Sequence, residues 1–201
     1  MTFHVFGVQV KIGFLFAFLV CCLLCFSNNV IIQLSVLFSL FHECGHLLSD
    51  CLYGVAPQAV RLGLFGMTIQ RADDIRLSYR QEIRTALAGP FVNLAFCILF
   101  FSFWYFLKTE LLLTCATVNL CIFLFNAMPV YSLDGGRALE AYLFEKNSEK
   151  TRVRIMFLTS LFCTALVMGA GFFFLFQSGH NFSLLMLSFY LIVTLFKKCG
   201  T

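Results

Sequence analysis

Six long apolar segments make up most of this 201-residue chain. They cover residues 6–27, 30–53, 86–107, 111–130, 155–176 and 182–197. About 20 apolar residues are enough for a helix to cross a bilayer. Because 60% of the residues are hydrophobic and only 12% are charged, a soluble domain of this length could not bury so much apolar surface. We therefore expect an all-α, multi-pass integral membrane protein with six transmembrane helices.

The basic residues fix the expected orientation of these helices. Thirteen of the 14 lysines and arginines fall on one side of the membrane, and Lys108 falls on the other. An excess of Lys and Arg marks the cytoplasmic side, so we expect both termini there, together with the connections 54–85 and 131–154. The basic residues are scattered over loops, so the net charge of +4 does not indicate a nucleic-acid partner.

The second apolar segment contains the motif H-E-x-x-H, which runs from His42 to His46. Residues four apart lie on one face of a helix, about 6 Å apart along its axis. This spacing suits two imidazoles that bind one Zn²⁺, with Glu43 as the general base for its water. Such side chains are costly in hydrocarbon unless they bind something. We predict one zinc ion per chain, about 16 Å from the cytoplasmic end of the helix and reached from the cytoplasmic side.

A catalytic zinc needs a third protein ligand and an open position. Asp50 shares the helical face of the two histidines, but it lies toward the cytoplasmic end, where we expect it to be solvated. Asp134 differs from the other acidic residues because it lies between the segments N-A-M-P-V-Y-S-L and G-G-R. Pro129 predicts a helix break in this stretch, and irregular backbone at membrane depth is tolerated only where protein or a water cavity receives it.

Together the two motifs resemble the site-2 protease family of intramembrane zinc metalloproteases, which pair H-E-x-x-H with a later N-P-x-P…L-D-G segment. Residues 126–137 are similar to that segment, with Ala127 in place of a proline. The resemblance implies that Asp134 is the third metal ligand and that Asn126 binds substrate. Asn93, three residues after Pro90, also matches a family feature, and we assign it to substrate binding too. The expected fold is one transmembrane protease domain, 1–201, with a three-helix catalytic core in spans two to four (residues 30–140), flanked by helices 6–27, 155–176 and 182–197.

The spaced form N-x-x-P…L-D-G is similar to the sporulation factor IV FB subgroup. Members often carry a C-terminal CBS domain, to which nothing in this sequence corresponds. The resemblance implies the bacterial cytoplasmic membrane as location. It also implies a membrane-associated protein as substrate, with a sporulation sigma-factor proform as one candidate. Inhibitory or regulatory membrane proteins are the further partners, besides the lipid bilayer.

Two local features leave alternatives open. Asn119 and Asn126 are seven residues apart and share a helical face, so with Asn93 they predict either a water path to the metal or hydrogen bonds between helices; we favour helix contacts for Asn119 and function for Asn126. Residues 55–70 predict a short β-hairpin-like loop. It either holds an unwound substrate by strand addition or simply covers the site.

Two other functions remain as alternatives to the protease. A membrane metal transporter could use His42, His46 and Asp134 as a transit site, but it predicts more acidic or His residues at depth and a repeat between halves. A catalytically dead relative that binds membrane proteins would not need the intact motifs.

Overall fold

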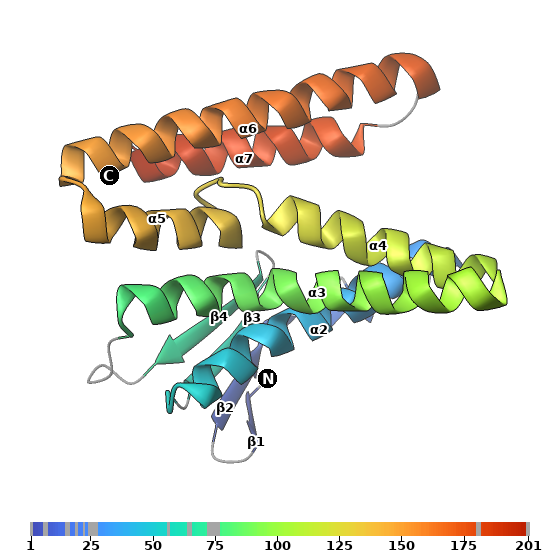
Figure 1. The fold of residues 1–201 in the computed structure, drawn as a ribbon, viewed down its shortest axis with the longest axis horizontal. Helices are drawn as coiled ribbons and strands as arrows, with labels where there is room; N and C mark the ends of the chain where they lie inside the picture. The colour runs from blue at the N-terminus through green and yellow to red at the C-terminus, as the bar shows by residue number, and fades with distance from the viewer. Residues whose placement is uncertain are drawn as a thin grey trace. The chain divides into compact units, whose positions relative to one another are not determined.

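The computed structural model describes residues 2–5, 8–14, 17–18, 20–21, 23, 28–55, 57–63, 66–71, 77–179 and 182–199. These residues form six helices and four strands (Figure 1). The structure is therefore mainly helical, as the sequence predicts, and it adds a four-stranded sheet. It divides into two compact units. Unit 1 comprises Met1–Gln81 and Ala88–Leu124, and unit 2 comprises Glu82–Leu87 and Phe125–Thr201.

Helix α2 (Val30–Leu52) carries the H-E-x-x-H motif. It begins after Asn29, whose side chain accepts a hydrogen bond from the backbone N–H of Ile31 and so satisfies one of the free donors of the first turn. Its buried residues are Phe38, His42, Gly45, His46 and Asp50. This spacing of three and four residues gives α2 a single inward face.

Unit 1 also contains two further long helices. Helix α3 (Tyr79–Leu107) begins with a capping box between Ser78 and Gln81, and helix α4 covers Glu110–Asn126. Phe38 of α2 packs with Cys115 and Val118 of α4 in one apolar cluster. The predicted fourth span, 111–130, is thus shorter as a helix, because α4 ends at Asn126.

The sheet of unit 1 has the strand order β1-β2-β3-β4, with bounds β1 (Thr2–Val5), β2 (Val8–Ile12), β3 (Pro57–Gly63) and β4 (Gly66–Arg71). β1 pairs with β2 and β3 with β4 in antiparallel fashion, while β2 and β3 are parallel. Parallel strands need a long crossover, and the stretch containing α2 supplies it. The pair β3–β4 lies where the sequence predicts a hairpin, and its turn residues 64 and 65 lie outside the described residues.

The structure corrects the predicted start of the first helix at residue 6. Val8–Ile12 is strand β2, and helical residues begin at Phe14. The segment Val-Gln-Val-Lys-Ile alternates apolar and polar side chains and is rich in β-branched residues, the pattern of a half-buried strand. Averaging hydropathy over a long window merged this short strand with the apolar residues that follow it.

Unit 2 consists mainly of three helices, α5 (Asp134–Lys146), α6 (Glu149–Ser178) and α7 (Ser183–Cys199). Helices α6 and α7 lie side by side (Figure 1). Their buried contacts include Met156 of α6 and Leu195 of α7, which pack with Tyr131 and Leu143. Gly179 ends α6 in the left-handed conformation, with φ of 71°, which glycine adopts without steric cost.

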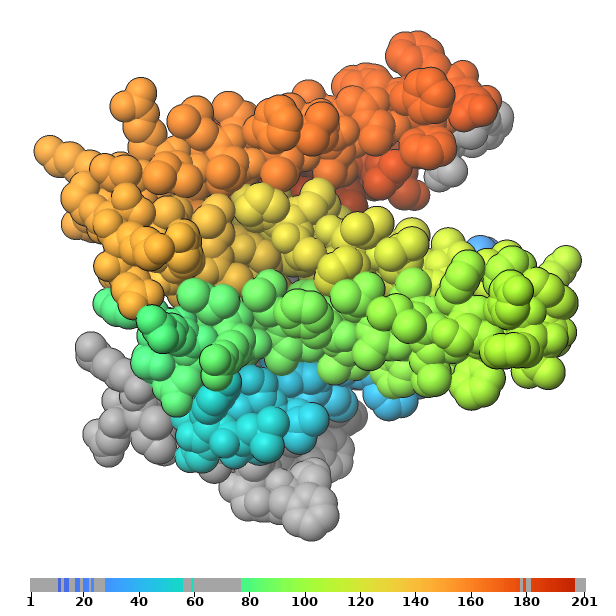
Figure 2. Space-filling model, viewed as in Figure 1, coloured from blue at the N-terminus to red at the C-terminus, as the bar shows by residue number. Residues whose placement is uncertain are grey.

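The surface of these helices is unusually apolar. Within the described residues, α2, α3 and α6 are long and apolar enough to cross a membrane, and α4 and α7 are shorter apolar helices. Side chains of α6 stand out along the face shown in Figure 2, and exposed aromatic residues of α3 and α6 include Phe101, Phe106, Phe162, Phe173 and Phe176. Apolar surface on this scale fits contact with lipid rather than water. The full set of six spans stays a prediction.

Candidate metal centre

The two motif histidines lie one helical turn apart on the buried face of α2, with 5% and 4% of their surface exposed. Their Nε2 atoms face each other at 3.3 Å. Two nitrogens bound to one tetrahedral zinc ion at about 2.05 Å are about 3.3 Å apart. His42 and His46 therefore already have the separation that a shared zinc ion requires.

Gly89 of α3 leaves room beside these two nitrogens. A Cβ atom built on Gly89 would lie 2.7 Å from Nε2 of His42 and would collide with Nε2 of His46. Any side chain larger than hydrogen would therefore fill the space in which a shared ion would bind. Gly45 permits the close approach of the two helices, because a Cβ there would lie 3.0 Å from the carbonyl oxygen of Ala88.

Two buried asparagines form a chain of hydrogen bonds that begins at His42. Oδ1 of Asn93 lies 2.7 Å from Nδ1 of His42, and Nδ2 of Asn93 donates to Oδ1 of Asn119 at 3.0 Å. Both asparagine side chains are fully buried. The sequence assigns Asn93 to substrate binding, whereas the structure engages its amide with groups of the protein.

The two acidic residues of α2 differ in their surroundings. Glu43 follows His42 directly in α2 and is half-buried. Asp50, one turn beyond His46, is fully buried. The expectation that Asp50 is a solvated helix end is therefore wrong. The backbone N–H of Val55 donates a hydrogen bond to the Asp50 carbonyl oxygen, so the chain that follows α2 covers this end of the helix.

Asp134 belongs to unit 2, where it is the first residue of α5. An acidic side chain is favoured at this position because the helix N-terminus carries partial positive charge. Its Oδ1 lies 3.5 Å from a guanidinium nitrogen of Arg137, and only 13% of its side chain is exposed. The helix N-terminus and Arg137 both interact favourably with an Asp134 carboxylate.

The two glycines after Asp134 have a steric role. A Cβ on Gly135 would collide with the Ala127 carbonyl, and one on Gly136 with the Val130 carbonyl. The irregular segment after α4 therefore folds directly over the first turn of α5. Both glycines lie in α5, and neither has positive φ.

The helix break predicted from Pro129 is present, because α4 ends at Asn126 and α5 begins at Asp134. Asn126, the second residue assigned to substrate binding, is the last residue of α4 and is half-buried. Ser160 of α6 holds the segment between α4 and α5. Its hydroxyl oxygen accepts a hydrogen bond from the backbone N–H of Tyr131 at 3.1 Å.

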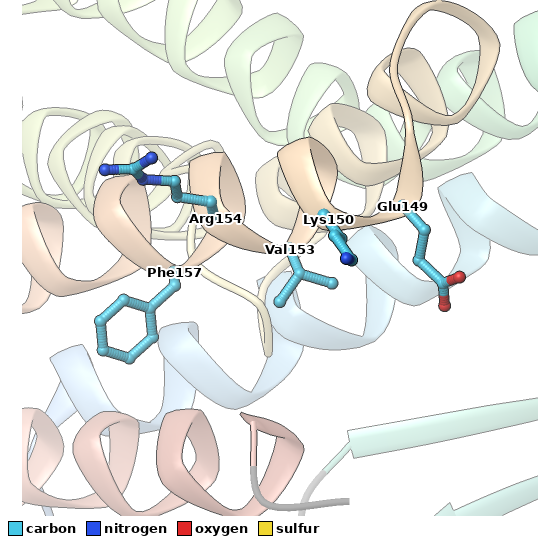
Figure 3. A pocket seen from close by; sticks show the side chains of 5 residues that line it. All are labelled: Glu149, Lys150, Val153, Arg154 and Phe157. Carbon is cyan, nitrogen blue, oxygen red and sulfur yellow. The ribbon is translucent and has the colours of Figure 1, made fainter.

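A separate hollow lies at the start of α6 (Figure 3). It is lined by Glu149, Lys150, Val153, Arg154 and Phe157. It contains none of the motif residues, and two of its three charged side chains are cations, which do not bind metal ions. We assign it no part in the chemistry of the motif.

Comparison with known proteins agrees with this chemistry. No family model matches the chain. The chain is 32% identical over 124 residues to Rip3 of Mycobacterium tuberculosis, a protein named as a zinc metalloprotease, in strains Erdman and H37Rv. The match covers 58% of this chain and 31% of Rip3, so this chain spans about a third of that relative.

A solved structure shows the same fold. The site-2 protease from Methanocaldococcus jannaschii matches with a TM-score of 0.65 and 21% sequence identity. The match covers 98% of this chain and 94% of that protein. The fold is thus that of a site-2 protease, and similarity to Rip3 supports a zinc metalloprotease.

Sequence reasoning missed the role of Gly89 and the burial of Asp50. One signal for the first was present, because Gly89 and Asn93 are four residues apart and so share a helical face. The favoured prediction for Asn119, a hydrogen bond between helices, is confirmed by its contact with Asn93.

Proposed function

We propose that this chain is a zinc-dependent intramembrane endopeptidase of the site-2 protease family. The observation that carries the proposal is the pair of Nε2 atoms of His42 and His46, 3.3 Å apart beside the space that Gly89 leaves open. The likeness of fold to the Methanocaldococcus protein and the similarity to Rip3 support the same assignment.

Asp134 is the third ligand in this proposal. Two imidazoles with one carboxylate are a common donor set for catalytic zinc, and the resemblance of residues 126–137 to the second family motif points to Asp134 as the carboxylate. The set leaves a fourth position for water or substrate. One ion per chain is sufficient for this chemistry.

The chain's own residues then perform the proton transfers. Zinc in this site would lower the pKa of a water molecule and polarise the substrate carbonyl. Glu43 accepts the proton of the attacking water and later delivers it to the leaving amine. Glu43 is assigned this role because it is the glutamate of the H-E-x-x-H motif.

The substrate in this proposal is a membrane-associated protein that unwinds before it is cut, because a helix shields its own peptide bonds. Strand β4 is at one edge of the sheet, where a substrate could pair by strand addition. The resemblance to the sporulation factor IV FB subgroup favours a sigma-factor proform, with other membrane proteins as regulators. We place the enzyme in the bacterial cytoplasmic membrane, with termini and active-site access on the cytoplasmic side.

Co-expression with candidate substrates tests this function. Wild-type protein should cleave one of them, and Glu43→Gln should not, because the amide cannot accept the proton of the water. Cleavage that survives the substitution would refute the protease. Metal flux into vesicles that persists in Glu43→Gln, without cleavage by the wild type, would instead indicate a transporter.

A further inference from the structure

We propose that Asn119 of α4 is a positioning residue for the metal centre, acting on His42 through Asn93. The inference rests on the proposed function and names a residue that does not itself touch the histidine. Three helices contribute to the chain of contacts: His42 lies on α2, Asn93 on α3 and Asn119 on α4. All these residues belong to unit 1.

The orientation of the Asn119 amide is fixed by a backbone carbonyl. Its Nδ2 lies 2.9 Å from the carbonyl oxygen of Cys115, which can only accept a hydrogen bond. The NH₂ group must therefore face Cys115, and Oδ1 of Asn119 must point the other way. That oxygen is the acceptor for Asn93, 3.0 Å away.

The same reasoning fixes the amide of Asn93. Its Nδ2 donates to Oδ1 of Asn119 and to the carbonyl oxygen of Phe38, at 3.0 Å and 3.3 Å. A flipped amide would place its oxygen against two acceptors. Oδ1 of Asn93 is therefore the atom that faces His42, at 2.7 Å.

The tautomer of His42 follows from these two orientations. Because Oδ1 can only accept, Nδ1 of His42 carries the proton and donates it to Asn93. Nε2 of His42 is then the unprotonated ring nitrogen, and it lies 3.3 Å from Nε2 of His46. This is the form of imidazole that binds a metal ion, and partners of this kind orient ligands and strengthen metal binding.

The hydrogen bond to Oδ1 of Asn119 holds the Asn93 amide in this orientation. Without it, Asn93 keeps only the longer contact to Phe38 for its NH₂ group. Its amide is then freer to turn its NH₂ toward His42, which would stabilise the wrong tautomer. Both asparagines are fully buried, so water does not readily replace the lost partner.

The chain of hydrogen bonds from Asn119 through Asn93 to His42 is called the relay below. Its test is the zinc affinity of the purified 201-residue chain, measured by chelator competition. Asn93→Leu should weaken zinc binding about 10- to 100-fold, the usual effect of losing such a partner, and Asn119→Leu should weaken it about tenfold. In the double variant the loss should equal that of Asn93→Leu alone, because Asn119 acts only through Asn93. Asn119→Asp keeps the acceptor oxygen for Asn93 but loses the donor to the Cys115 carbonyl, so it should restore only part of the affinity.

Thr117→Val is the matched control on α4. Its hydroxyl bonds only to the Leu113 carbonyl of its own helix, so zinc affinity should be unchanged. Wild-type affinity in Asn119→Leu, or losses that multiply in the double variant, would overturn the relay while the protease proposal stands. A wild-type chain that binds no zinc would instead overturn the proposed function and the relay with it.

Discussion

A methyl group on Gly89 would lie 2.7 Å from Nε2 of His42, within the space that a zinc ion shared with His46 would occupy. Zn–N bonds are about 2.0–2.1 Å long, so a carbon atom and the ion cannot both fit there. The glycine is thus needed for the site rather than for an unusual backbone angle.

Gly89→Ala should therefore abolish zinc binding while α3 still forms, since alanine is a better helix former than glycine. Metal analysis of the purified protein would measure this loss. Gly169→Ala in α6 is a suitable control, because nothing lies within 4 Å of a Cβ there. Wild-type zinc content in Gly89→Ala would show that the ion binds elsewhere.

Asp134→Ala should reduce zinc affinity and cleavage together, because a ligand of the proposed set is lost. Arg137→Gln removes only the partner at 3.5 Å, and such part-exposed pairs contribute about 0–1 kcal/mol. We expect its zinc content to be close to that of the wild type. Equal losses in the two variants would indicate that the ion pair matters and that Asp134 is not a ligand.

Met67→Pro should block cleavage if β4 receives the substrate. Proline removes a backbone donor from the edge strand, whereas Met67→Val keeps that donor and suits a strand. Cleavage assays, with thermal unfolding to monitor folding, would separate the two variants. Normal cleavage by a folded Met67→Pro protein would show that the hairpin does not bind substrate and only covers the site.

Much of the helical framework follows from local sequence. The predicted segment 30–53 matches α2 at Val30–Leu52, because Asn29 caps a long and mainly apolar run. Pro129 correctly predicted a break before Asp134. These features depend on neighbouring residues alone, so a sequence pattern is sufficient to find them.

The features that local sequence did not predict depend mainly on how the helices pack against one another. Gly89 reaches the histidine nitrogens because Gly45 allows α3 to approach α2, and no periodicity within either helix encodes that register. The burial of Asp50 likewise depends on chain that returns over the end of α2. Strand β2 was missed for a different reason: its own alternating pattern is short, and a long hydropathy window merges it with the apolar residues that follow.

Metal removal from the reconstituted enzyme tests the central claim most directly. Purified protein in lipid vesicles would be stripped with a chelator, resupplied with zinc and assayed on a membrane-spanning substrate, with the cut mapped by mass spectrometry. The account predicts that cleavage is lost, that zinc restores it in the wild type but not in Glu43→Gln, and that the cut lies in or beside the apolar span. Cleavage by the stripped protein, or by zinc-loaded Glu43→Gln, would contradict it.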